Sequence, residues 1–189
     1  MLRGIDVSSH QSSFSTEGVS FVIVKATEGR TYTNPRLSAQ TERAREAECV
    51  MGFYHFLWPG NITAQAEYFV AKAPEQAGDF LAVDWEWTGD HTAATNAEKD
   101  RFIKEVKRLR PNLRTVLYTN RDFWLNRDTT SYAGDGLWIA DYVTAGKPRI
   151  RADWRIHQYT STPLDKNVAD FPSKDAMRDW ATPQPGPAP

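Results

Sequence analysis

Short runs rich in β-branched and aromatic residues alternate with helical patterns along most of this chain of 189 residues. This alternation constrains the fold more than any other feature, because it favours a mainly parallel sheet connected by crossover helices. Seven runs are predicted as strands, and an eighth is expected near residues 168–171. The seven runs are 4–8, 21–26, 52–57, 80–86, 115–119, 137–140 and 155–159.

Three helices are predicted between these strands. Asn34 and Pro35 match an N-cap followed by proline at the first helical position. Pro74 ends a second helix. Its apolar face is formed by Ala66, Phe69, Val70 and Ala73. Thr95 and Glu98 match the capping box that opens a third helix.

Helical signals fade after residue 118, and the predicted strands come closer together. A complete set of eight strand–helix units is therefore not expected. The pattern predicts an irregular TIM-like β/α barrel of about eight strands with fewer helices, in which loops join the last strands. Residues 1–180 are expected to form one domain. Residues 181–189, which include four prolines among small and polar residues, are predicted to be a Pro-rich linker or tail.

The segment 80–87 places two acids on an otherwise apolar strand. Because side chains alternate across a strand, Ala82, Asp84 and Glu86 share one face. The opposite face carries Leu81, Val83 and Trp85. The outer face of a barrel strand packs on helices, and the C-terminal strand ends surround the active site. Asp84 and Glu86 are therefore expected at the mouth of the barrel.

Two further acids are predicted to reach the same rim. Asp6 alternates with Ile5 and Val7 on the first strand, and Asp165 follows the strand that ends near residue 159. Carboxylates that converge repel one another unless they share protons. Glycoside hydrolysis uses such a set, because one carboxyl donates a proton while a nearby charge stabilises the transition state. For a lone pair of acids, ordinary strand-end caps or surface ion pairs would be the better interpretation.

In this order the motifs resemble the family 25 glycoside hydrolases, the muramidases called Chalaropsis-type lysozymes, which are common among phage endolysins. The resemblance runs from residue 4 to about residue 167. The matching pieces are GIDVS at 4–8, FVIVKATEG at 21–29, GFYHF at 52–56, VDWE at 83–86, LYT at 117–119, LWIA at 137–140 and QY at 158–159. Each piece is short, and their order makes the match specific.

The resemblance implies an endo-acting N-acetylmuramidase, a lysozyme that hydrolyses the β-1,4 bond between N-acetylmuramic acid and N-acetylglucosamine in bacterial peptidoglycan. It implies that Glu86 is the general acid and that Asp6, Asp84 and Asp165 complete the acidic site. An ionised Asp84 is expected to raise the pKa of Glu86 and to keep it protonated near neutral pH.

Four residues are predicted to bind substrate: Tyr54, Tyr118, Trp138 and Gln158. The three aromatic residues lie at predicted strand ends, where they would stack on sugar or hydrogen-bond the acids. Packing in the core is an equal interpretation for each of them. Gln158 belongs to the strand-end pair that matches the family. His157 departs from the aromatic residue that usually precedes this pair, which concerns the cleft wall and not the acids.

Two other classes of function stay open, a metal-dependent polysaccharide deacetylase and a non-catalytic cell-wall sugar-binding module. A deacetylase site would need an aspartate and two histidines. The histidines are His10, His55, His91 and His157, and no HxxxH or HExxH spacing occurs. No metal and no organic cofactor are expected. Cys49 has no CxxC partner and is predicted to be a buried structural thiol.

The charge balance, 23 basic against 24 acidic residues, argues against a nucleic-acid partner. No run approaches the ~18 apolar residues of a membrane span, so no membrane insertion is expected. The first residues leave no room for a signal peptide, which predicts synthesis in the bacterial host cytoplasm and action on the wall after release. The expected partners are peptidoglycan glycan strands, contacted by a monomer, with a C-terminal wall-binding module absent from this chain.

Overall fold

The computed structural model describes residues 1–183. Within them the elements follow one another in the order β1 (Leu2–Val7), β2 (Phe21–Glu28), β3 (Tyr32–Thr33), α1 (Leu37–Glu46), β4 (Val50–Phe56), α2 (Ile62–Lys72), β5 (Phe80–Asp84), α3 (Asn96–Leu109), β6 (Arg114–Asn120), the π-helix η1 (Phe123–Arg127), β7 (Leu137–Ala140), β8 (Ile156–Thr160), β9 (Lys166–Ala169) and α4 (Lys174–Ala181).

Eight of these strands form a closed ring, because β1 pairs with β2 on one side and with β9 on the other. The order around the ring is β1, β2, β4, β5, β6, β7, β8 and β9, while β3 forms a hairpin with β2. Neighbouring strands from β1 to β8 are parallel, whereas β9 is antiparallel to both β8 and β1. The irregular barrel is confirmed, and its eighth strand begins at Lys166, two residues before the predicted 168.

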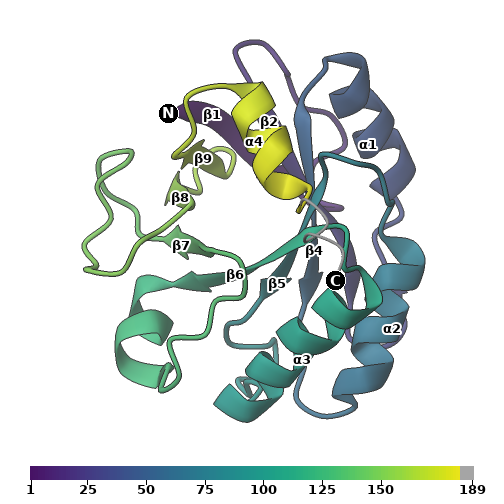
Figure 1. Ribbon diagram of the computed structural model, residues 1–189, viewed down its shortest axis with the longest axis vertical. Coiled ribbons are helices and arrows are strands. Elements are labelled where there is room, and N and C mark those ends of the chain that lie inside the picture. Colours follow the sequence, from purple (N-terminus) through teal and green to yellow (C-terminus); the bar gives the residue numbers. More distant parts are fainter. Residues whose placement is uncertain (184–189) are drawn as a thin grey trace, which may run out of the picture.

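The helices are unevenly distributed around the ring. In Figure 1, α1, α2 and α3 lie on one side of the barrel, while loops surround β7 and β8 on the other. This confirms that fewer helices than strands are present and that loops join the last strands. No helix in the described part of the chain is both long and apolar enough to cross a bilayer.

Three helix boundaries test the capping signals. Thr95 and Glu98 form the predicted capping box of α3, and α2 ends at Lys72, before Pro74. The predicted start of α1 is wrong by two residues, since the helix begins at Leu37. The Asn34 side-chain oxygen accepts a hydrogen bond from Arg36 N at 3.0 Å. Asn34 therefore forms a turn that precedes the helix, as asparagine often does.

The short helix α4 was not predicted from the sequence. Ser173 caps it by accepting a hydrogen bond from Ala176 N at 3.1 Å, which is a readable N-cap signal. The helix continues to Ala181, and Thr182 accepts a hydrogen bond from Gly78 N at 2.7 Å. Residues 184–189 of the predicted tail lie outside the described residues, so the division at residue 180 stays a prediction.

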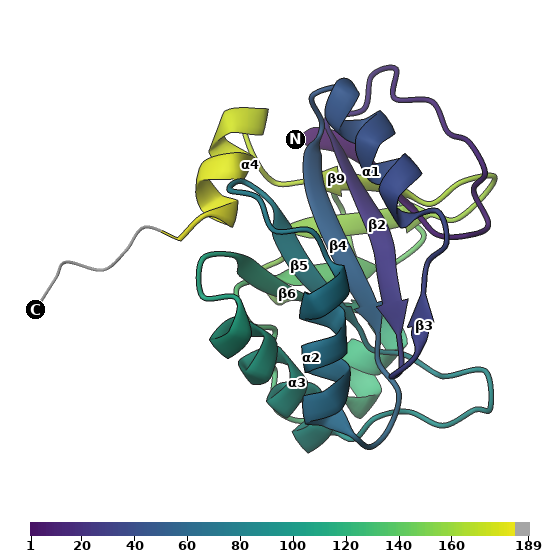
Figure 2. The ribbon, with the colours of Figure 1, turned by 90° about the vertical axis from the view of Figure 1, so that its right-hand side faces the viewer.

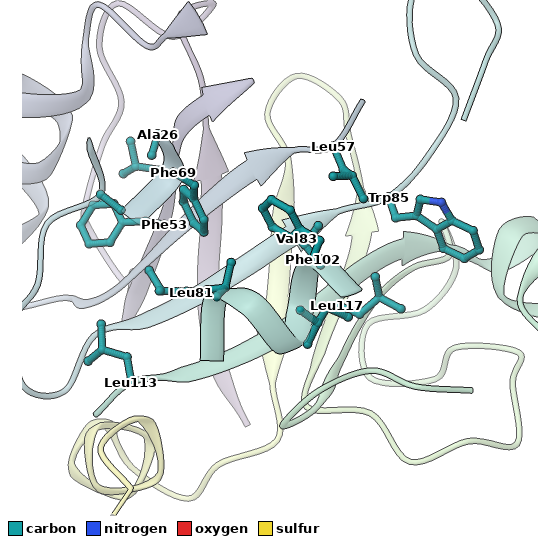
Figure 3. Packing of buried hydrophobic residues seen from close by; sticks show 14 of the residues in the cluster. Ala26, Phe53, Leu57, Phe69, Leu81, Val83, Trp85, Phe102, Leu113 and Leu117 are labelled. Carbon is teal, nitrogen blue, oxygen red and sulfur yellow. The ribbon is translucent and has the colours of Figure 1, made fainter. Parts of the chain in front are cut away.

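The outer face of the sheet packs against the helices. Figure 3 shows Leu81, Val83 and Trp85 of one strand in the same apolar layer as Phe102 of α3, as the alternation along residues 80–86 predicted. Cys49 is free and lies in this layer too, which confirms the predicted buried thiol. Burial of such a layer is the main favourable term in folding.

The interior of the ring is closed at one end. Phe21 and Phe80 fill it near the start of their strands, and Gly4 and Gly52 make room for them, because a Cβ at either glycine would overlap the facing ring. Met177 of α4 packs against the same interior cluster. Figure 2 shows α4 set apart from α2 and α3. The barrel is therefore plugged at its N-terminal end, and only the C-terminal end is left for a site.

Candidate active site

A cavity of about 220 Å³ opens at the C-terminal ends of the strands. It is lined by Asp6, Tyr54, Asp84, Glu86, Tyr118, Trp138, Tyr142, Gln158 and Asp165. The structure thus brings together all eight residues predicted from the sequence. Tyr142 is the further one. It lies two residues beyond β7, where the strand-end rule that selected the acids would also have found it.

The backbone around Trp85 presents Glu86 to the cavity. Asp84 is the last residue of β5, and Glu86 lies in a bend just beyond it. Trp85 N donates to Tyr118 O at 3.0 Å, and Thr119 Oγ1 donates to Trp85 O at 2.8 Å. The Trp85 indole, 1% exposed, donates to a loop carbonyl at 2.8 Å. Because Trp85 is fixed outward in this way, its two acidic neighbours are held on the opposite face.

Asp6 is held by two side-chain amides. Gln158 Nε2 and Asn167 Nδ2 donate to the same oxygen, Asp6 Oδ2, at 2.8 and 2.7 Å. Trp138 Nε1 donates to Asn167 Oδ1 at 2.8 Å, and an indole N–H can only donate. The Asn167 amide must therefore turn its NH₂ group toward Asp6. It follows that a proton on Asp6 resides on Oδ1 and not on Oδ2.

Two tyrosines fix the second amide in the same manner. Tyr118 and Tyr142 donate their hydroxyls to Gln158 Oε1 at 3.0 and 3.1 Å. Tyr118 and Gln158 are buried, while Tyr142 is 57% exposed. Asn167 was not predicted as a site residue. Its position depends on the pairing of β9 with β1, which local sequence does not reveal.

Burial raises the pKa of both Asp6 and Asp165. Burial, followed by the charge of Asp165, raises the pKa of Asp6 to about 7, although the hydrogen bonds from Asn167 and Gln158 act in the opposite direction. Burial also raises the pKa of Asp165. A backbone hydrogen bond holds these two residues side by side, since Asp6 N donates to Asp165 O at 3.3 Å.

Asp84 and Glu86 affect each other's pKa. Burial raises the pKa of both, and the charge of Glu86 raises that of Asp84 further. A hydrogen bond from Asp84 lowers the pKa of Glu86 again. Within residues 1–183, Asp84 Oδ1 is buried without a partner of its own, which disfavours an ionised Asp84. The expectation that an ionised Asp84 raises the pKa of Glu86 is therefore wrong, because burial raises the pKa of Glu86 while the contact with Asp84 lowers it.

A cation stands beside this pair. Lys25 Nζ donates to Glu28 Oε2 at 2.6 Å, and Trp58 Nε1 donates to Glu28 Oε1 at 2.9 Å. The positive charge of Lys25 also opposes the effect of burial on the pKa of Asp84 and Glu86. Lys25 thus limits how strongly the site holds its protons.

The buried histidines face away from the cavity. His55 hydrogen-bonds Thr27 Oγ1 at 2.8 Å and Gln65 Oε1 at 3.0 Å, and burial lowers its pKa to about 4. His157 Nε2 lies 2.7 Å from Asp141 O. Across residues 1–183, no group of three or more His, Cys, Asp or Glu side chains is arranged to hold a metal ion. The donors of a deacetylase site, one aspartate with two histidines, are thus not assembled in the described residues.

Comparison with known proteins agrees with this geometry. The profile of the glycosyl hydrolases family 25 matches residues 5–168. The N,O-diacetylmuramidase of Chalaropsis sp is 34% identical over 143 residues, covering 65% of this chain and 68% of that protein. The lysozyme of Streptococcus phage Cp-9 is 33% identical over 188 residues, covering 87% of this chain and 52% of that protein.

Similarity to solved structures extends to the whole fold. A family GH25 lysozyme from Aspergillus fumigatus has a TM-score of 0.82 at 24% identity, covering 96% of this chain and 99% of that one. The chain spans about half the length of its clostridial and streptococcal phage relatives. Since the family profile matches nearly the whole barrel, including all four acids of the cavity, this chain belongs to the family 25 glycosyl hydrolases.

Proposed function

We propose that this chain is an endo-acting N-acetylmuramidase that hydrolyses the β-1,4 bond between N-acetylmuramic acid and N-acetylglucosamine in bacterial peptidoglycan. One observation carries the proposal: four carboxyls with raised pKa values converge in one cavity at the mouth of the barrel. Relatives named lysozyme and N,O-diacetylmuramidase support the choice of substrate. An intact set of acids argues against a sugar-binding module with a decayed site.

In the proposed mechanism Glu86 donates a proton to the glycosidic oxygen as the bond to the anomeric carbon breaks. The neutral Asp84 stabilises the carboxylate that forms on Glu86, since its hydrogen bond favours the ionised form of Glu86. Asp84 thereby strengthens the acid at the moment it loses its proton. Such stabilisation of a developing charge is the usual way in which a preorganised site lowers a barrier.

Asp6 and Asp165 supply negative charge to the transition state. In the first scheme the 2-acetamido oxygen of the substrate attacks the anomeric carbon, and Asp84 or Asp165 orients the amide. In the second, Asp6 acts directly as nucleophile or base. Its Oδ1 suits that role, because both amide donors bind Oδ2. Trapping a covalent sugar adduct on Asp6 would establish the second scheme, and inhibition by a thiazoline analogue of the cyclised intermediate would support the first.

The proposal extends to the setting of the reaction. Action as a monomer stays a prediction. Relatives named as phage lysozymes support action on the bacterial wall. Synthesis in the host cytoplasm and a separate wall-binding module remain predictions.

Mass spectrometry of fragments released from purified peptidoglycan tests the function. New reducing ends on muramic acid are expected, and the rate should persist after exhaustive chelation. New reducing ends on glucosamine would indicate a different glycosidase. Loss of acetyl groups without new ends, abolished by chelation, would indicate a deacetylase. Binding without any product would indicate a sugar-binding module.

A further inference from the structure

A second and larger cavity, of about 530 Å³, lies on the outside of the barrel beside β7 and β8. We call it the outer groove, and the side chains that give it its character are Trp124, Tyr132, Asp135, Asp153, Trp154 and Arg155. It shares no lining residue with the acidic cavity. Figure 1 shows loops around β7 and β8, where other parts of the ring are covered by helices. The outer groove exists because η1 and two loops replace a helix there.

Three half-buried aromatic rings form the apolar part of the outer groove. Trp124 comes from η1, Tyr132 from the loop after it, and Trp154 from the residues before β8, and all three pack against the outer core on one side. Trp58, Trp85 and Trp138 donate their indole N–H to protein acceptors. Within residues 1–183, Trp124 and Trp154 have no such acceptor, and the Tyr132 hydroxyl has no hydrogen-bond partner. A flat ring with a free donor at its rim suits a pyranose.

The charges in the outer groove are nearly balanced. Asp135 is already compensated, because it accepts hydrogen bonds from Lys107 Nζ, from Arg114 Nη1 at 3.3 Å and from Thr115 N at 2.8 Å. Asp153 and Arg155 then remain, one of each sign. Counted with Lys107 and Arg114, the outer groove has three basic and two acidic groups, so it offers at most one excess positive charge to a polyanion and none to a basic peptide. It offers hydrogen-bonding groups to an uncharged ligand that carries hydroxyl and acetamide groups.

The loop beside the outer groove is held firmly. Lys99 Nζ is fully buried and donates to Asp128 Oδ1 at 2.9 Å, to Thr130 Oγ1 at 3.0 Å and to Tyr132 O at 2.9 Å. Asn96 accepts a hydrogen bond from Thr129 N at 2.9 Å. Because contacts within the protein hold this loop, binding in the outer groove does not have to order it.

We propose that the outer groove is a second glycan-binding site, which takes an uncharged stretch of N-acetylhexosamine units. This rests on the proposed function, because it gives the same polymer two places to bind. A wall presents many strands side by side, so one strand held in the outer groove keeps the acidic cavity close to another. Two linked sites on one polymer network raise the local concentration of substrate without any new catalytic contact.

The test compares an insoluble polymer with short soluble fragments. Trp154→Ala and Trp124→Ala are made separately, with Leu125→Ala as the matched control, since Leu125 is exposed on η1 and does not line the outer groove. Affinity for purified sacculi, freed of attached polymers, is measured by sedimentation in a Glu86→Gln background, where digestion is suppressed. Rates are measured in the active chain on sacculi and on a soluble tetrasaccharide fragment of peptidoglycan.

Each tryptophan variant is expected to lose about fivefold in affinity for sacculi, the size of one aromatic contact, with a similar rise in KM on sacculi. The rate on the tetrasaccharide and all properties of Leu125→Ala should stay unchanged. Unaltered sedimentation of both tryptophan variants would overturn the proposal. An equal loss on both substrates at unchanged Tm would also overturn it, since the effect would then lie in the acidic cavity.

Tyr132→Phe and Asp153→Ala serve if a tryptophan variant lowers Tm, because they leave the rings in place. A smaller loss of sedimentation in the same direction supports the glycan site, and no loss in either variant counts against it. A parent chain that digests neither substrate would refute the proposed function. Sedimentation with sacculi would still report on the outer groove in that case.

Discussion

The two sides of the barrel are stabilised by different means. The side from β1 to β6 carries α1, α2 and α3, and apolar packing holds it, as where Phe102 stacks on His55 at 4.8 Å. The side from β6 to β9 has η1 and loops instead. Polar contacts hold it, such as the ion pair of Arg149 with Asp141 at 2.6 Å and the hydrogen bond from Trp138 to Asn167. Apolar layers tolerate changes of shape, whereas polar contacts depend on particular atoms.

The acidic cavity needs both sides. Asp84 and Glu86 come from the helix-covered side, while Asp165 comes from the loop-covered side together with the amides that hold Asp6. The contrast predicts that stability will be most sensitive to polar substitutions where the sides meet, and that catalysis will be sensitive to acids from either side.

The largest effect is expected where a helix on one side holds a loop on the other. Lys99→Met removes the only cation that faces Asp128 within the described residues and leaves a buried carboxylate unpaired. We expect a loss of about 3–5 kcal/mol in the free energy of unfolding, measured by thermal or urea unfolding. Phe102→Leu in the apolar layer is the control and should cost less than about 1.5 kcal/mol. A Lys99→Met chain as stable as the parent would remove the distinction between the two sides.

Glu86→Gln tests the acid from the helix-covered side. It preserves shape but removes the transferable proton, so the rate on peptidoglycan should fall at least ~100-fold. Exposed Glu67 on α2 supplies the control, and Glu67→Gln should keep the parental rate. Retained rate in Glu86→Gln would show that another residue is the proton donor.

Asp6→Asn tests how the buried carboxyl of Asp6 makes the stability of the fold depend on pH. The folded-state pKa of Asp6 is about 7, above its ordinary 3.8, so the folded form binds the proton more tightly than the unfolded form. Stability from this proton is fully present below pH 4 and is lost as the pH rises through 7. Compared with the parent, Asp6→Asn should gain on the order of 4 kcal/mol of stability between pH 4 and pH 8, because the pKa difference of about 3 is worth ~1.4 kcal/mol per unit. Parallel Tm–pH curves for parent and variant would contradict this.

The smallest effect is expected for Asp165→Asn, on the loop-covered side. Burial is the largest cause of the raised pKa of Asp6, and the charge of Asp165 is the second. Removing that charge should therefore lower the pKa of Asp6. The acidic limb of the rate profile, where Asp6 must lose its proton, should shift to lower pH, with a loss of about tenfold in kcat. Asp170→Asn, an exposed acid just after β9, should leave the profile unchanged. An unchanged pH–rate profile in Asp165→Asn would show that Asp165 does not affect the pKa of Asp6.

Local patterns predicted the helix-covered side and the acids. Alternation placed Leu81 and Val83 outside and Asp84 inside, and the capping box opened by Thr95 marked α3. Periodicity is a strong signal there because each element buries one face. Ser173 offered a comparable signal for α4, but an eight-residue helix is too short to show a clear period.

The local patterns could not predict contacts between strands that are far apart in the sequence. Asn167 reaches Asp6 only because β9 runs antiparallel beside β1. The effect of Asp84 on the pKa of Glu86 depends on how deeply each of the two residues is buried. Their spacing of two positions does not reveal this. The sequence identified which residues meet, and the closed ring determined what each one does to its neighbours.

Because the ring closes between β1 and β9, the acidic cavity needs residues from both the first and the last strand of the barrel. Asp6 is synthesised 161 positions before its partner Asn167. A nascent chain that stops short of β9 lacks both Asp165 and the strand that completes the barrel. Contacts of such long sequence separation form slowly and late in folding. We therefore expect no hydrolysis until β9 has been synthesised and the barrel is complete.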